Sequence, residues 1–483
     1  MFQKEYQETE QHIQRCDFSR AASCCENVIF SDSVVNDTYW CITRAWCLYR
    51  VGLIEDAQAL FEDEWEIICS SIHALDDATF SRLYDFFWSI HAYEKLLSVC
   101  ELRLAVAPTA DLLRRCAVLY SRLTNYASAV DCYSKALSIQ SSSSTAYNLG
   151  VSLLQLGRYE EGLSLYEHRF DVFEKSYLLR DSAFTVPRWP GDLSMPSKLL
   201  EGKGVIVWAE QGFGDVIQFS RYLRLLAERG AYTLLLLPAA YASLELLLKG
   251  LDGVDDVAVI SSNKINLTRP YHYHLPLMSC MNHFGLQCHT VPAVIPYINT
   301  STHCFSACSS LALSIKTQRL KQPKRYIGIV WSTAVNSIVN DKALLAQDIK
   351  YEKSISFDQL SALLAIEGVQ FVNLKFPLSA QERRELNKYN VEDYSDKVSN
   401  FADTALLIES LDLIVSIDTA VAHLAGALGK PVINMLPYDS DWRWQMETDT
   451  TPWYPTMQLY RQKNRGNWTE VLVRVAEYIK SLA

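Results

Sequence analysis

A carboxylate, a hydroxyl and an imidazole stand close together in the most informative stretch of this sequence. An apolar run at 413–417 predicts a buried strand that ends on Asp418, after which Thr419 opens a short helix and Gly429 closes it. Thr419 and His423 are four residues apart and therefore share one helix face. Ligands of open parallel sheets bind beyond the carboxyl ends of the strands, and a helix N-terminus favours an anion. The stretch therefore predicts a site for the charged end of a nucleotide-sugar.

A second group of residues suited to chemistry follows the apolar run at 204–209. Gly212 and Gly214 let the backbone turn sharply towards the next helix and leave room for a ligand. They place Asp215 at the mouth of this turn, where a carboxylate can take a proton from a substrate hydroxyl, a role worth about 10²–10⁴-fold in rate. Simple capping of the helix is the alternative for Asp215. Ile217 replaces the third glycine of the dinucleotide fingerprint, which argues against NAD binding.

The elements that must position these residues are parallel strands. Short apolar strands alternate with helices from residue 204 onwards, a pattern typical of parallel sheets. A loop-rich region at 299–324 separates the strands into two sets. We therefore expect two Rossmann-like halves with a cleft between them.

The N-terminal third carries a helical repeat instead. Tyr126 and Tyr133 recur as Tyr159 and Tyr166, an offset of 166 − 133 = 33 residues. This spacing resembles the tetratricopeptide repeat, whose period is about 34 residues. Copies are recognised at 112–139 and 144–170, with a fainter one from Trp40 and no register over 62–108. The repeats predict a concave surface for a protein or peptide; a structural or dimerising arm is the alternative.

The composition describes a globular chain of several domains. Of 483 residues, 49% are hydrophobic and 21% charged, and the net charge of −10 argues against a nucleic-acid or anionic-membrane surface. The N-terminus has no signal-peptide pattern, and no apolar run reaches the ~20 residues of a transmembrane segment. Thirteen cysteines form no C-x2-C pair. We expect a cytoplasmic protein whose thiols are reduced and buried.

Several motifs, taken together in order and spacing, resemble those of bacterial tetratricopeptide-repeat glycosyltransferases. The C-terminal half of these proteins is similar to the ADP-heptose heptosyltransferases of glycosyltransferase family nine. The resemblance spans roughly residues 110–475 and rests on Glu210-Gln211-Gly212-Phe213-Gly214-Asp215, Gly328-Ile329-Val330-Trp331-Ser332, Phe401-Ala402-Asp403-Thr404-Ala405, the stretch 416–426, Asp441-Trp442-Arg443-Trp444 and Trp453-Tyr454-Pro455.

This resemblance implies a GT-B fold, with the acceptor facing the first half and the donor held by the second. Such enzymes are typically inverting and need neither a metal nor another cofactor. Asp215 matches the family's proposed general base. Three residues match its donor-site motif, and two match the loop that touches the donor phosphate: Asp418, Thr419 and His423, then Ser332 and Thr333.

The sequence departs from the family around the phosphate loop. Thr333-Ala334 stands where relatives often have Gly-Asn, and Lys353-Ser354 stands where they have Arg-Ser, after a long loop at 336–352. Lys353 still offers one positive charge to the donor but no bidentate fork. This change leaves the identity of the donor open and motivates an inactive alternative.

Aromatic and acidic residues near the C-terminus allow competing interpretations. Trp331, Trp442 and Arg443 could stack a sugar or a base, or could pack where the halves meet. Asp439 and Asp441 form a D-x-D pattern, but this pattern binds metal in another glycosyltransferase fold, so no metal site is expected.

The predicted organisation is a helical domain followed by two α/β halves. The expected boundaries are 1–170 for the tetratricopeptide-like helices, 171–200 for a linker, 201–322 for the acceptor-side half, 323–466 for the donor-side half and 467–483 for a terminal helix.

We expect a cytoplasmic glycosyltransferase that moves a sugar from a nucleotide-sugar to a hydroxyl acceptor. The repeats favour a protein acceptor, for which flagellin is one candidate, and they leave a homo-oligomer open. Two alternatives remain: a catalytically inactive repeat scaffold that binds a nucleotide or nothing, and a lipopolysaccharide heptosyltransferase.

Overall fold

The computed structural model describes two compact units, Met1–Ser152 and Leu153–Ala483. The ranges it describes are 3–29, 38–173, 179–192, 194, 199–261, 269–300, 315, 317, 324–333 and 353–482. The predicted loop at 336–352 and two of the cysteines, Cys304 and Cys308, lie outside these ranges.

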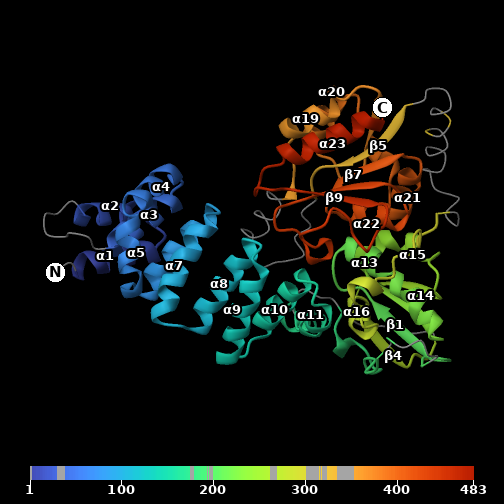
Figure 1. Cartoon of the computed structure of the whole chain (residues 1–483), viewed down its shortest axis with the longest axis horizontal. Helices are drawn as coiled ribbons and strands as arrows, with labels where there is room; N and C mark the ends of the chain where they lie inside the picture. Colours follow the sequence, from blue (N-terminus) through green and yellow to red (C-terminus); the bar gives the residue numbers. More distant parts are fainter. Residues whose placement is uncertain are drawn as a thin grey trace. The chain divides into compact units, whose positions relative to one another are not determined.

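Antiparallel helical hairpins build the first unit (Figure 1). Its helices are α1 (Gln3–Gln14), α2 (Phe18–Ile29), α3 (Thr38–Arg50), α4 (Ile54–Asp63), α5 (Trp65–Ser71), η1 (Ile72–Ala74), α6 (Asp77–Ser89), α7 (Tyr93–Val106), α8 (Ala110–Arg122) and α9 (Tyr126–Ile139), and α10 (Ser143–Gln155) crosses into the second unit.

The hairpins share one backbone device. In each, a residue with a positive φ stands two positions before the second helix begins. These residues are Cys16, Gly52, His91, Thr124 and Gly157, which precede Phe18, Ile54, Tyr93, Tyr126 and Tyr159. The left-handed conformation reverses the chain tightly enough for the two helices to pack against each other.

The predicted repeat is confirmed and reaches further than the sequence indicated. Tyr93, Tyr126 and Tyr159 are 33 residues apart (126 − 93 and 159 − 126), and each is a buried first residue of its helix. The repeat over 62–108 is hard to recognise in the sequence because α5 and η1 are inserted there. They lengthen the preceding spacing to 93 − 54 = 39 residues.

Two parallel sheets form the second unit. The first has the strand order β3-β2-β1-β4 and consists of β1 (Gly204–Trp208), β2 (Tyr232–Pro238), β3 (Asp256–Ile260) and β4 (Tyr273–Pro276). Its helices are α13 (Phe213–Phe219), α14 (Arg221–Glu228), α15 (Glu245–Leu248) and α16 (Cys280–His283), with the short turns η3 (Ala239–Leu244) and η4 (Leu277–Ser279).

The second sheet has the order β6-β5-β7-β8-β9 and is also parallel. Its strands are β5 (Arg325–Val330), β6 (Val369–Asn373), β7 (Leu413–Ile417), β8 (Val432–Leu436) and β9 (Met457–Arg461). Its helices are α19 (Phe357–Leu364), α20 (Ala380–Lys388), α21 (Phe401–Glu409), α22 (Ala420–Ala427) and α23 (Thr469–Leu482). Repeats followed by two Rossmann-like halves are the predicted fold class, which is confirmed.

The two α/β halves meet where α13 packs against α22 (Figure 1). Each of these helices follows the carboxyl end of a strand, β1 in one half and β7 in the other. The ligand-binding edges of both sheets therefore face the same junction.

The boundary between the units lies earlier than predicted. The helices α11 (Tyr159–Tyr166) and α12 (Arg169–Val172) belong to the second unit and not to a domain that ends at 170. Polar contacts hold them there: Tyr166 Oη bonds the Gln211 side chain, and Arg169 forms an ion pair with Glu210. Sequence periodicity cannot reveal this, because α11 keeps the spacing of the repeat.

The described ranges also bear on the membrane question. Within them, no helix is both long enough and apolar enough to cross a bilayer.

The hairpin turns offer a test of the repeat geometry. Thr124 adopts a φ of 60°, a conformation that costs a non-glycine residue roughly 1–2 kcal/mol. We expect Thr124→Gly to raise the free energy of unfolding by about 0.5–1 kcal/mol. Urea unfolding followed by far-UV circular dichroism measures the change.

Two controls separate the backbone from the side chain. Thr124→Ala keeps the strained φ and should gain nothing. Gly157→Ala, at a φ of 73° with no atom within 4 Å of the new methyl group, should lose about 1 kcal/mol through the backbone alone. Equal stability of Thr124→Gly and Thr124→Ala would show that the turn is not strained.

Candidate active site

The N-terminus of α22 is built as predicted from the sequence. Thr419 is its N-cap residue, with an extended backbone, but makes no side-chain cap to the helix. Its hydroxyl lies 3.0 Å from the Ser416 hydroxyl instead. Because no side chain caps the first N–H groups, they can bind an anion together with the positive end of the helix dipole.

Asp418 holds two nitrogen-bearing side chains beside this helix end. Lys353 Nζ lies 3.5 Å from Asp418 Oδ2, and His423 Nε2 lies 3.9 Å from Asp418 Oδ1. Burial lowers the pKa of Lys353, but the carboxylates of Asp418 and Asp441 outweigh burial and raise it overall. Lys353 is therefore charged at neutral pH and available to a phosphate.

His423 is a neutral hydrogen-bonding group. Its Nδ1 lies 3.0 Å from the hydroxyl of Tyr454, and its ring stacks on Trp444. Burial lowers the pKa of His423 to about 4, against the opposing effect of Asp418. At pH 7 the imidazole can donate or accept one hydrogen bond at Nε2 but carries no charge.

Gly214 brings the two halves into contact. A Cβ atom at this position would lie 2.7 Å from His423 Cδ2, closer than real Cβ contacts come. Only glycine therefore lets α13 reach α22. The residue after it, Asp215, is thus placed beside the donor-site motif, as the predicted cleft requires.

Asp215 is paired across the junction. Arg443 Nη2 donates to Asp215 Oδ1, and Arg443 Nη1 donates to Asp441 Oδ1 at 2.7 Å. Burial raises the pKa of Asp215, Arg443 opposes this effect, and the carboxylates of Asp441 and Asp418 add to it. The side chain remains 23% exposed, so a substrate hydroxyl can reach it.

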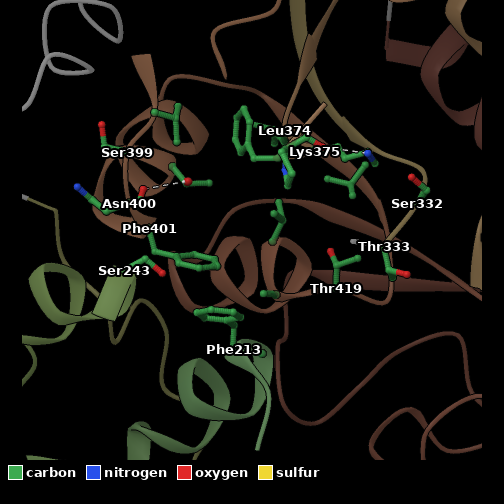
Figure 2. Close-up of a pocket in the computed structure, with 18 residues that line it drawn as sticks. Phe213, Ser243, Ser332, Thr333, Leu374, Lys375, Ser399, Asn400, Phe401 and Thr419 are labelled. Atoms are coloured by element: carbon green, nitrogen blue, oxygen red, sulfur yellow. Dashed lines mark hydrogen bonds between the residues drawn. The ribbon is translucent and has the colours of Figure 1, made fainter. Parts of the chain in front are cut away.

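A cavity of about 450 Å³ lies beside this charged cluster. Ser332, Thr333 and Thr419 line one end, and Ser399, Asn400 and Phe401 line the other (Figure 2). Phe213 enters from the first half, and its ring centroid is 5.2 Å from that of Phe401. The cavity has a hydroxyl-rich end at the α22 N-terminus, and at its other end two phenylalanines lie beside Ser399 and Asn400. This arrangement fits a phosphate joined to an aromatic base.

The predicted stacking residues occupy other places. Trp331 packs against Phe357, Trp442 packs against Trp453, and neither tryptophan lines the cavity. Arg443 is buried between two carboxylates, with its guanidinium 4.9 Å from the Trp442 ring centroid. Arg443 is thus an ion-pair partner of Asp215 in this structure. Trp331, Trp442 and Arg443 form no stacking surface in the cavity.

Several polar residues of the cavity are not predicted from the sequence, among them Asn400 and Lys375. Asn400 caps α21 by accepting from the N–H groups of Ala402 and Asp403, a helix-start signal that could have been recognised. Lys375 is buried after β6, where its Nζ lies 2.9 Å from Glu382 Oε1. A lone lysine after a strand gives no comparable signal in one sequence.

The D-x-D carboxylates are each taken by a cation. Asp439 lies 3.2 Å from Arg465 Nη1, and Asp441 pairs with Arg443. Across the residues that the structure describes, no three histidine, cysteine or acidic side chains are grouped to hold a metal ion. The absence of a metal requirement stays a prediction.

Two sequence comparisons relate this chain to known proteins. Residues 395–467, which include Asp418, Thr419, His423 and Arg443, match the sequence profile of glycosyltransferase family 9 (heptosyltransferase). Over 350 residues the chain is 25% identical to Protein FlbA of Caulobacter vibrioides, a match that covers 68% of this chain and 54% of that protein. The chain therefore spans about half the length of this curated relative.

Solved structures are similar only at a distance. The crystal structure of the glycosyl transferase family 9 from Veillonella parvula covers 58% of this chain and 96% of its own, with 10% identity and a TM-score of 0.39. The structure named MamA MSR-1 C2 covers 36% of this chain and 96% of its own, with 17% identity and a TM-score of 0.30. Scores this low carry no argument, so the fold rests on the helices and strands described above.

The neutral state of His423 predicts an acid-sensitive site. A histidine whose pKa is about 4 when folded and 6.5 when unfolded stabilises the fold above pH 6.5 and loses this contribution as the pH falls towards 4. At pH 5 the loss is on the order of 2 kcal/mol. We expect the drop in Tm between pH 7 and pH 5 to be smaller in His423→Gln than in the wild type.

The matched control is His289→Gln, because His289 is exposed. It should leave the pH dependence of Tm unchanged. Identical drops in the wild type and in His423→Gln would contradict a buried, neutral imidazole at position 423.

The contact at Gly214 predicts a sharp difference between two nearby glycines, Gly212 at the N-cap of α13 and Gly214 within the helix. Gly214→Ala forces a methyl group against the His423 ring, whereas a methyl group at Gly212 meets only the flexible end of Asp215, at 3.3 Å. We expect Gly214→Ala to cost about 1–3 kcal/mol through overpacking, and Gly212→Ala to cost less. Thermal unfolding of both variants measures this, and equal costs would exclude the close approach of α13 to α22.

Proposed function

We propose that this chain, which joins tetratricopeptide-like helices to a glycosyltransferase family 9 segment, moves a sugar from a nucleotide-sugar to a hydroxyl acceptor. One observation carries the proposal. A single junction brings together a free helix N-terminus, a charged lysine and a carboxylate from the opposite half, next to a cavity of about 450 Å³. The family match over 395–467 supports glycosyl transfer as the reaction.

The donor's diphosphate would rest at the hydroxyl-rich end of the cavity. Ser332, Thr333 and Thr419 offer hydroxyl groups there, and the N–H groups of α22 offer uncapped donors. Lys353 is within reach because it is already held by Asp418, at the strand end that precedes the helix. Preorganised donors of this kind stabilise the charge that develops on a leaving phosphate, in place of a metal.

Asp215 is the proposed general base. Its pKa is raised by burial, which favours uptake of a proton from an acceptor hydroxyl. The Arg443 ion pair keeps the carboxylate ionised and oriented until the acceptor arrives. Attack on the anomeric carbon from the side of Asp215, opposite the diphosphate, would invert the configuration at that carbon.

The acceptor is proposed to be a protein. The first unit is an array of helical hairpins, an architecture that commonly binds extended peptide segments. A bacterial surface protein such as flagellin would fit this arrangement. We propose that the reaction takes place in the cytoplasm, where the buried thiols among the described cysteines would stay reduced.

A nucleotide-binding scaffold without turnover is the rival. The observation that favours it is the charge pairing in the unliganded site, where both Lys353 and Asp215 already have partners of opposite charge. A lipopolysaccharide heptosyltransferase is the third candidate. The helical repeats favour the protein-directed enzyme over it.

Turnover of a donor panel tests the proposal. ADP-, GDP-, UDP- and CMP-sugars are incubated with the full chain, and release of the nucleotide is followed with water as the acceptor. We expect slow hydrolysis of one donor class, with Asp215→Asn at least about 100-fold slower because the base is lost. Lys353→Met should raise the donor KM about tenfold by removing one phosphate contact.

The control is Asp252→Asn, a change at an exposed residue that does not line the cavity, which should turn over like the wild type. Thermal stabilisation by a nucleotide without any release would support the scaffold instead. Wild-type turnover in Asp215→Asn would remove Asp215 from the mechanism.

A further inference from the structure

Glu210, which precedes the turn to Asp215, forms a buried ion pair with an arginine from the end of the repeat array. The segment 153–172, here called the terminal hairpin, contains the end of α10, all of α11 and all of α12. Arg169 of this segment is fully buried, and its Nη2 donates to Glu210 Oε1 at 2.7 Å. Glu210 stands two positions before Gly212, where the turn that leads to Asp215 begins.

Arg169 is the centre of a buried polar network. Besides Glu210, it donates to Glu167 Oε1 and to the Ser279 hydroxyl, each at 2.7 Å. Burial raises the pKa of Glu210 to about 7, and the Arg169 ion pair opposes this effect. Without the Arg169 guanidinium, the fully buried Glu210 carboxyl would lose the cation bonded to it and would keep only the weaker effect of the Arg188 charge.

The next residue of the loop has a partner on the same hairpin. Gln211 Nε2 donates to the Tyr166 hydroxyl at 3.2 Å. Two consecutive loop residues are therefore fixed from α11 and α12, immediately before Gly212 and Asp215.

The terminal hairpin also reaches the loop that supplies Arg443. Gln155 Nε2 donates to the Ser440 carbonyl at 2.6 Å, and Gln445 Nε2 donates to the Tyr159 hydroxyl at 3.1 Å. These contacts lie on either side of Asp441 and Arg443 in the sequence. The terminal hairpin thus contacts both chain segments that supply the Asp215–Arg443 ion pair across the junction.

We propose that the terminal hairpin is a positioning element of the active site, with Arg169 as the residue that sets the direction of the Asp215 loop. This inference rests on the proposed transferase function. Arg169 acts through Glu210 and touches none of the residues that line the cavity except through the loop itself. Its loss should therefore misplace the base and leave donor binding intact.

Steady-state kinetics of Arg169→Met in the full chain test the inference. Misplacing a catalytic group by about 1 Å can cost about 100-fold in rate. We expect kcat to fall about 10- to 100-fold, with the donor KM within about twofold of the wild type. The matched control is Arg158→Met, which removes an exposed arginine of the same hairpin whose partner is Glu161. It should leave both constants unchanged.

A double variant separates positioning from folding. Arg169→Met combined with Glu210→Gln removes both charges and leaves no buried carboxylate without a cation. It should recover most of the Tm lost in Arg169→Met, while kcat stays low because the amide introduced at position 210 has no guanidinium to orient it. Recovery of kcat together with Tm, or wild-type kcat in Arg169→Met, would overturn the positioning role.

Amide hydrogen exchange tests the positioning role of Arg169 even if the protein turns over no donor. Amide exchange over residues 209–215 should be faster in Arg169→Met than in the wild type and in Arg158→Met. Absence of turnover in the wild type would count against the proposed function alone. Unchanged exchange in the loop would count against the positioning role alone.

Discussion

The close approach of α13 to α22 is the contact on which the rest of the site depends. Two parallel sheets present their carboxyl edges to one junction, but side chains larger than hydrogen would keep the helices apart. At position 214 a Cβ atom would lie only 2.7 Å from the His423 ring. Glycine has no Cβ atom and so allows the two helices to touch. Asp215 of one half then lies within reach of Arg443 of the other, and the cavity forms between Phe213 and Phe401. The glycine at position 214 therefore allows side chains of both halves to meet in one site.

Charge compensation is the second constraint, because the junction buries several ionised groups. Asp418 faces Lys353, and Arg443 is shared by Asp215 and Asp441. Each buried charge would be costly alone, so the cluster alternates in sign. In the proposed reaction, a diphosphate would bind to Lys353 and the α22 N-terminus, beside the neutral His423. The resting pairs and the liganded site can thus use the same side chains.

The sequence revealed most of what depends on local pattern. The strand that ends on Asp418, the α22 helix, the glycine turn before Asp215 and the 33-residue repeat are readable because each follows from short-range spacing. The Arg443 partner of Asp215 is 228 positions away in the chain, and no local pattern joins them. The burial of Trp331 depends on its contact with Phe357, and the burial of Trp442 depends on contacts with Tyr159 and Trp453, which no local pattern reveals. An isolated Lys375 looks like any surface lysine. For the same reason, repeat spacing predicts a boundary at 170, although α11 keeps that spacing and packs on the α/β unit.

The terminal hairpin shows that the end of the repeat array also has a structural role in the α/β unit. If helical repeats served only to bind an acceptor, their last turn would be free to diverge, and contacts with the catalytic loops would be incidental. Instead, Arg169 places a fully buried guanidinium against Glu210, and Gln155 and Tyr159 hold the segment that carries Arg443. Burying this much charge at one place is costly unless the geometry is maintained on both sides. The α/β unit therefore includes the end of the repeat array, which holds the segments that carry Glu210 and Arg443, and a boundary drawn by repeat spacing would cut through it.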